Sequence, residues 1–159
     1  MKLEFILNGE DVIVNSESNN RLVDILREKF SLLGTRPGCG VGFCGACTVI
    51  FNGEAVNSCL IPAFKAQGGE IITIEGFSQT DEYQDILLGF SEAGVEDCGY
   101  CRTGKILACG TLIDRNLRPT KNEILPAFSD IKCRCTDAQE LVQGVIAAAE
   151  HRRKRLYGS

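Results

Sequence analysis

The chain has 159 residues, of which 44% are hydrophobic, 24% are charged and nine are cysteines, and its formal net charge is −4. These proportions are those of a globular protein and exclude a disordered or fibrous chain. The negative charge argues against a nucleic-acid-binding protein, which would carry a basic surface. No run of about 18 apolar residues occurs, so the sequence predicts no membrane span.

The first half of the chain alternates short apolar runs with turn residues. Two pairs of runs are separated by Asn-Gly, at residues 8–9 and 52–53, and this dipeptide between apolar runs predicts a β-hairpin. Between the hairpins, apolar residues recur at helical spacing from Leu22, after the capping residues 19–20 and up to Gly34. Residues 71–74 add a last strand. We therefore expect a mixed α+β unit at residues 1–76, which also contains a glycine-rich loop.

The second half, residues 77–159, has helical periodicity. One helix is predicted at residues 83–90, ending at Gly94, and a second at residues 106–113. Thr120 and Thr136 each precede a Glu or Gln by three residues, and this capping-box pattern predicts that a helix begins after each. The sequence therefore predicts a four-helix bundle, with the domain boundary near residue 76.

A basic run at residues 151–155 ends the last predicted helix. The simpler interpretation is a solvated helix end, because cations are favourable at the negative end of the helix dipole. The alternative interpretation is a contact with an acidic partner subunit.

How the cysteines are interpreted depends on the cellular compartment in which the protein folds. The N-terminal residues lack the pattern of a signal peptide, so we expect a cytoplasmic protein. In a reducing cytosol, clustered cysteines are metal ligands or redox groups more often than disulfides. An odd total of nine fits eight ligands and one spare thiol.

Four cysteines lie in and after the glycine-rich loop, and we call them the first cysteine set: Cys39, Cys44, Cys47 and Cys59. Their spacing, C-x4-C-x2-C followed by a distant cysteine, is that of plant-type 2Fe–2S centres. The loop glycines allow the backbone to turn its N–H groups toward the sulfurs of an anionic centre. A structural zinc site, the alternative, usually pairs two C-x2-4-C knuckles, and this loop does not.

Four more cysteines, the second cysteine set, form a C-x-x-C and a C-x-C pair: Cys98, Cys101, Cys133 and Cys135. A C-x-x-C pair at a helix start is also typical of thioredoxin-like proteins, but the strand that precedes it there is missing, and the C-x-C pair would be unexplained. Two pairs at facing helix starts indicate a second metal centre, because helix N-termini offset its negative charge. The remaining Cys109 shares a helical face with isoleucines and is expected to be a buried, inert thiol.

Several segments together resemble the small iron–sulfur subunit of molybdenum hydroxylases, the xanthine dehydrogenase family. The resemblance covers nearly the whole chain. It implies a ferredoxin-like β-grasp domain at residues 1–76 and an all-α four-helix-bundle domain at residues 77–159, each holding one 2Fe–2S cluster. The segments that carry it are residues 38–48, 58–60, 72–76, 98–101 and 133–136.

The resemblance also implies partners. In that family the cluster of the helical domain lies next to the molybdopterin of a large subunit, and the other cluster lies nearer the FAD of a medium subunit. The chain is then expected to relay electrons within a hetero-oligomeric oxidoreductase, with the two cysteine sets as cluster ligands. It has no room for the molybdenum and flavin domains and is expected to hold no catalytic residue of its own. The alternative is a free-standing two-cluster ferredoxin, or the electron-transfer subunit of a reductase without molybdopterin.

Departures from the family pattern gather at the second set. The family has Gln before its C-G-[FY]-C motif and Thr-Pro-Gly-Met after it, where this chain has Asp97 and Arg102-Thr103-Gly104-Lys105; Asp137-Ala138 replaces a Gly-Tyr after the C-R-C-T motif. One interpretation is a different neighbouring cofactor or partner surface, and the other is drift compensated in the partner. Because Arg102 and Lys105 add positive charge close to Cys101, they predict a raised reduction potential for the second cluster.

Overall fold

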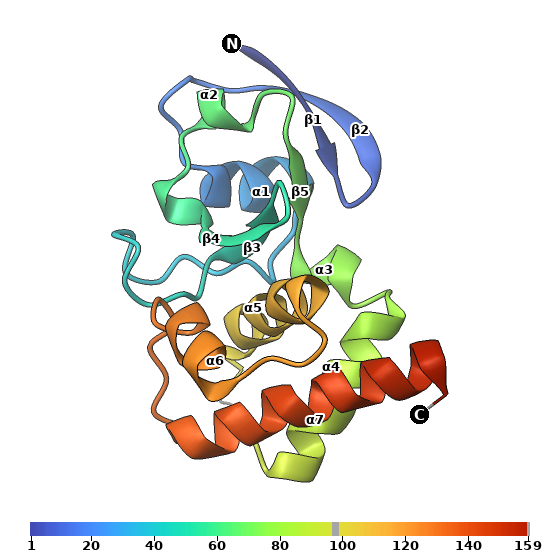
Figure 1. Cartoon of the computed structure of the whole chain (residues 1–159). Coiled ribbons are helices and arrows are strands. Elements are labelled where there is room, and N and C mark those ends of the chain that lie inside the picture. Colours follow the sequence, from blue (N-terminus) through green and yellow to red (C-terminus); the bar gives the residue numbers. More distant parts are fainter. Residues whose placement is uncertain (97–98, 159) are drawn as a thin grey trace.

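The computed structural model describes residues 1–96 and 99–158, with strands gathered in one half and helices in the other (Figure 1). In these ranges five strands form one mixed sheet in the order β2-β1-β5-β3-β4. β1 and β5 are parallel, and the other neighbouring strands are antiparallel. The strands are β1 (Lys2–Leu7), β2 (Glu10–Asn15), β3 (Thr48–Phe51), β4 (Glu54–Asn57) and β5 (Glu70–Ile72).

Both predicted hairpins are present, β1 with β2 and β3 with β4. Their turns have positive φ at both central residues: 51° and 85° at Asn8 and Gly9, and 50° and 84° at Asn52 and Gly53. Such turns match the right-handed twist of the flanking strands, which is why Asn-Gly favours them. Alternate residues of β1 are buried, so one face of the sheet packs on a core.

The ends of α1 (Leu22–Phe30) differ from the prediction. Its N-cap is Arg21, because the Asn20 side chain donates to the Ser16 hydroxyl instead. Its C-cap is Ser31, whose φ of 56° stops the helix before Gly34. The last predicted strand, residues 71–74, is also too long, because residue 74 begins the short helix α3 (Ile74–Phe77).

The remaining helices follow in chain order, and α5 lies between the sheet and α7 (Figure 1). The helical core includes Ile50 of β3, so the sheet and the helices share packed side chains. Within the described ranges, no helix is long and apolar enough to span a membrane. The elements are α2 (Ala63–Ala66), α4 (Asp81–Ala93), α5 (Arg102–Arg115), α6 (Lys121–Ala127), α7 (Ala138–Tyr157) and a 3-10 turn (Ser58–Leu60).

Two helix boundaries confirm the sequence prediction, and one does not. Gly94 ends α4 in the left-handed conformation, and Thr120 forms the capping box of α6. The capping box predicted at Thr136 is wrong, because α7 is capped by Asp137, whose carboxylate accepts from the N–H of Glu140 at 2.8 Å. The Thr136 hydroxyl contacts a different segment, which is described below with the second cysteine set.

The basic run at the end of α7 makes contacts within the chain. Arg152 is only 4% exposed and pairs with Asp114 of α5, so the interpretation as a solvated helix end is wrong for this residue. Arg155 donates from Nε and Nη2 to Oδ2 of Asp85 in α4, at 3.0 and 2.8 Å. These cations therefore tie α7 to α4 and α5.

The bidentate contact between Arg155 and the buried Asp85 predicts a measurable contribution to stability. We expect Asp85→Ala to lower the free energy of unfolding by about 2 kcal/mol, because it removes a buried carboxylate together with its hydrogen bonds to the guanidinium. Chemical denaturation of the full chain measures this change. Glu150→Ala is the control: it removes an exposed pair with Lys154 and should leave the unfolding curve unchanged. Equal curves for the two variants would contradict the prediction.

Candidate metal centres

The first cysteine set is held by the loop of residues 36–47 and by Cys59 on the 3-10 turn after β4. Gly40, Gly42 and Gly45 have φ of 72°, 75° and 78°. A Cβ on Gly45 would also lie 2.8 Å from the carbonyl oxygen of Asp130. Residues with a side chain disfavour positive φ, and a side chain would not fit at residue 45. The glycines therefore allow the loop to fold closely around the sulfurs.

Backbone N–H groups surround the sulfurs of this loop. In the described part of the chain, seven of them donate to sulfurs of the first set, at 3.1–3.5 Å. Three of the seven, the N–H groups of Val41, Phe43 and Cys44, donate to the Cys39 sulfur. Such a concave array of donors stabilises negative charge on sulfur, as an anionic iron–sulfur centre requires.

Two thiols of the first set have pKa values that are shifted in opposite directions. Hydrogen bonds from the N–H groups of Val41, Cys44 and Phe43 lower the pKa of Cys39 to about 6. Burial, together with the neighbouring Cys47, raises the pKa of Cys59 to about 11. Without a metal, the Cys59 thiol therefore stays protonated at neutral pH, and a bound metal centre would supply the positive charge that its thiolate needs.

The second cysteine set joins two distant segments. Cys101 is the N-cap of α5, and its Sγ lies 3.2 Å from the Sγ of Cys133. The N–H of Cys135 donates to the Cys133 sulfur at 3.3 Å. The predicted helix start at the C-x-C pair is wrong, because α7 begins only at residue 138. The fourth predicted member, Cys98, lies outside the described residues, as does Asp97.

The surroundings of Cys133 favour its thiolate. Burial opposes ionisation, but hydrogen bonds from the Lys105 side chain, from Cys101 and from the N–H groups of Cys135 and Thr136 together lower its pKa to about 7. By contrast, burial raises the pKa of Cys109, which is fully buried in the helical core. The prediction that Cys109 is a buried thiol is thus confirmed.

The two cysteine sets are linked through the backbone. The N–H of Lys132, next to Cys133, donates to the carbonyl oxygen of Cys44 at 3.1 Å. A Cβ on Gly104, in the first turn of α5, would lie 2.7 Å from the carbonyl oxygen of Gly45. The start of α5 and the segment before Cys133 therefore both pack against the loop of the first set.

The structure separates two cations that the sequence treats alike. Arg102 has an exposed side chain, whereas Lys105 is 2% exposed. The Lys105 ammonium donates to the Glu96 carbonyl and to the Thr136 hydroxyl, each at 3.1 Å, and the Thr136 hydroxyl also contacts the Glu96 carbonyl. The burial of Lys105 against Glu96 and Thr136 was not predicted from the sequence. The signal that could have indicated it is the spacing of Lys105 from Cys101, about one helical turn, which places both residues on one face of the helix.

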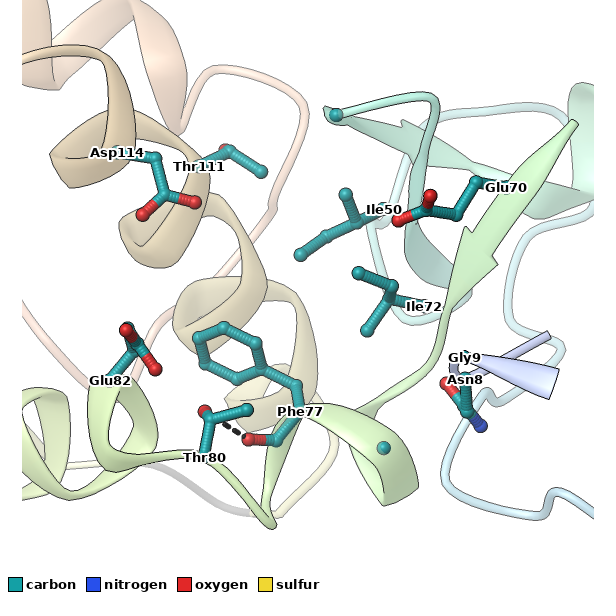
Figure 2. Close-up of a pocket in the computed structure, with 12 residues that line it drawn as sticks. Asn8, Gly9, Ile50, Glu70, Ile72, Phe77, Thr80, Glu82, Thr111 and Asp114 are labelled. Carbon is teal, nitrogen blue, oxygen red and sulfur yellow. Dashed lines mark hydrogen bonds between the residues drawn. The ribbon is translucent and has the colours of Figure 1, made fainter. Parts of the chain in front are cut away.

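A cavity of about 470 Å³ lies between the sheet and helices α3, α4 and α5 (Figure 2). Its lining includes the apolar side chains of Ile50, Ile72 and Phe77 and the carboxylates of Glu70, Glu82 and Asp114. Among the residues that the structure describes, no cysteine lines it. The cavity is therefore separate from the described members of both cysteine sets.

Comparison with known proteins places these features in a family. The 2Fe-2S iron-sulfur cluster binding domain matches residues 5–70, and a second 2Fe-2S binding domain matches residues 73–146. The nicotinate dehydrogenase small FeS subunit of Eubacterium barkeri is 44% identical over 144 residues, 91% of this chain and 92% of that protein. The nicotine 6-hydroxylase small subunit of Paenarthrobacter nicotinovorans is 34% identical, over 93% of this chain and 89% of that protein.

A solved structure agrees with this relationship. Quinoline 2-oxidoreductase from Pseudomonas putida 86 contains a chain that matches this one with a TM-score of 0.83 at 33% identity, and 96% of each chain is covered. The predicted fold class, a ferredoxin-like β-grasp part followed by a helical part, is confirmed. Fold and matched domains together define a protein with two 2Fe–2S binding domains.

Within that class the relatives identify a narrower group. The chain belongs to the family of small iron–sulfur subunits of molybdenum hydroxylases of the xanthine dehydrogenase type. It is therefore a component of an oxidoreductase and is not catalytic alone, as the sequence predicted.

Proposed function

We propose that this chain relays electrons between two partner subunits of a hydroxylase complex, a large one that contains molybdopterin and a medium one that contains FAD. A 2Fe–2S centre supplies the ability to accept and return a single electron. The chain's own residues hold the centres, exclude water and set the charge around them. Residues 1–76 and 77–159 are proposed as the two domains that each hold one centre.

The proposed ligands of the first centre are Cys39, Cys44, Cys47 and Cys59, and those of the second are Cys98, Cys101, Cys133 and Cys135. In the first set the side chain of Cys39 lies within hydrogen-bonding range of Cys44, and that of Cys59 within range of Cys47. Among the described residues, no three His, Cys, Asp or Glu side chains converge on one point. Pairs of thiols suit a two-iron centre, in which each iron takes two protein ligands, better than one tetrahedral zinc ion.

The observation that carries the proposal is the contact between the segments that hold the two cysteine sets. The hydrogen bond from Lys132 N–H to the Cys44 carbonyl connects the residue before Cys133 to a member of the first set. Tyr100, which precedes Cys101, places its hydroxyl over Gly38, 2.8 Å from where a Cβ would lie. Such proximity supports transfer of electrons between two centres inside one chain.

Purification of the tagged chain from its native cells under anaerobic conditions tests the proposal. We expect a large chain with bound molybdopterin and a medium chain with bound FAD to co-purify. We also expect about four iron and four sulfide per small chain, and two distinguishable EPR signals after reduction with dithionite.

Each departure from this result has a distinct meaning. A chain that holds about four iron but purifies without pterin or flavin would favour the free-standing two-cluster ferredoxin. A chain that holds about two iron and gives one EPR signal would overturn both the relay and the two-cluster ferredoxin.

A further inference from the structure

A buried lysine lies among the segments that carry the second cysteine set. Lys105 is about one helical turn after Cys101, and its backbone N–H donates to the Cys101 carbonyl at 3.1 Å. Its ammonium reaches across to the Glu96 carbonyl and the Thr136 hydroxyl, each at 3.1 Å. Thr136 directly follows Cys135 in the sequence. The Lys105 side chain therefore joins the segments of Glu96 and Thr136 to the helix that begins after Cys101.

Burial makes this ammonium electrostatically strong. A charge with 2% of its residue surface exposed is poorly screened by water or salt, so it acts on neighbouring charges more strongly than a surface cation does. A 2Fe–2S centre with four thiolates becomes more negative when it is reduced. A fixed positive charge beside it consequently favours the reduced state.

We propose that Lys105 is a positioning residue that raises the reduction potential of the second 2Fe–2S centre, as an internal cation held by Glu96 and Thr136. This inference rests on the proposed function, because it requires that the second centre is present. Arg102 lies closer to Cys101 in the sequence, but its side chain is exposed and its charge is screened by solvent. The potential should therefore depend on Lys105 and much less on Arg102.

Redox titration of the iron-loaded full chain, monitored by EPR, tests the inference with three variants. Lys105→Met removes the charge and keeps the length of the side chain, whereas Lys105→Gln removes the charge and keeps a hydrogen-bond donor. Arg102→Met is the matched control on the surface. We expect both Lys105 variants to lower the midpoint potential of the second centre by about 59 mV. For a one-electron centre this shift corresponds to a tenfold fall in the ratio of reduced to oxidised centre at a given potential. The first centre should keep its wild-type potential in every variant, and Arg102→Met should leave both potentials unchanged.

Several results would overturn the inference. If Lys105→Gln keeps the wild-type potential, the charge of Lys105 does not set the potential of the second centre. If Arg102→Met shifts the potential as far as Lys105→Met does, the burial of Lys105 gives its charge no larger effect than that of a surface cation. Loss of the second signal in both Lys105 variants would make Lys105 a structural clamp only. Iron analysis separates these outcomes from a failure of the proposed function, in which the wild-type chain itself holds about two iron.

Discussion

Cys47→Ala is expected to remove about half of the iron from the anaerobically purified chain, from about four to about two per molecule. Cys47 is buried at the base of the loop, and its sulfur accepts from the N–H of Cys59 at 3.4 Å. Without this thiolate one iron of the first centre keeps a single protein ligand. The signal of the second centre should persist, because its proposed ligands lie on other segments.

Cys109→Ala is the matched control for this experiment. Cys109 is as buried as Cys47, so both substitutions delete a thiol from the interior, but Cys109 lies in the helical core away from both sets. The control should keep about four iron and both EPR signals. Iron analysis and EPR after dithionite reduction measure the difference. If Cys47→Ala also kept about four iron, Cys47 would not be a ligand of the first centre.

The second prediction concerns the close packing of α4 on α7. Gly89 of α4 lies against the backbone of α7, and an added Cβ would be 2.6 Å from the Cα of Ala148 and 2.8 Å from the carbonyl carbon of Ala147. Backbone atoms cannot move aside as a side chain can, so Gly89→Ala forces the two helices apart. We expect a loss of about 3 kcal/mol in the free energy of unfolding, despite the better helix propensity of alanine.

Gly144→Ala provides the comparison from the opposite helix. Its added Cβ would meet side chains, with Val95 Cγ2 at 2.6 Å and a Phe90 ring carbon at 3.0 Å, and both can adjust. We therefore expect a smaller loss, about 1 kcal/mol. Chemical denaturation of both full-length variants measures the two values. A Gly89→Ala chain as stable as Gly144→Ala would show that the helices tolerate separation.

Gly89→Ala also has an expected effect on the second centre. The segment that holds Glu96 follows α4, and the segment that holds Thr136 precedes α7. Moving the helices apart should weaken the contact of both residues with Lys105. Iron content of this variant should therefore fall at the second centre before it falls at the first.

Local signals in the sequence were sufficient for several elements. The Asn-Gly turns predicted both hairpins, because the left-handed conformation that they favour is a property of two adjacent residues. The capping box at Thr120 and the glycine at residue 94 likewise placed helix ends correctly. Predictions failed where the backbone at a boundary was decided by a distant contact, as at Thr136, whose hydroxyl is engaged with Glu96.

The sequence by itself determined the candidate ligands, because cysteine spacing and loop glycines are local patterns with a specific chemistry. It also indicated the family, which the matched domains and relatives then established. Tertiary structure alone decided which distant segments meet the two cysteine sets. The Lys132 hydrogen bond to Cys44 and the burial of Lys105 rather than Arg102 both depend on segments far apart in the chain. Packing brings these segments together, and Glu96 and Thr136, the partners that bury Lys105, lie on segments outside its own helix.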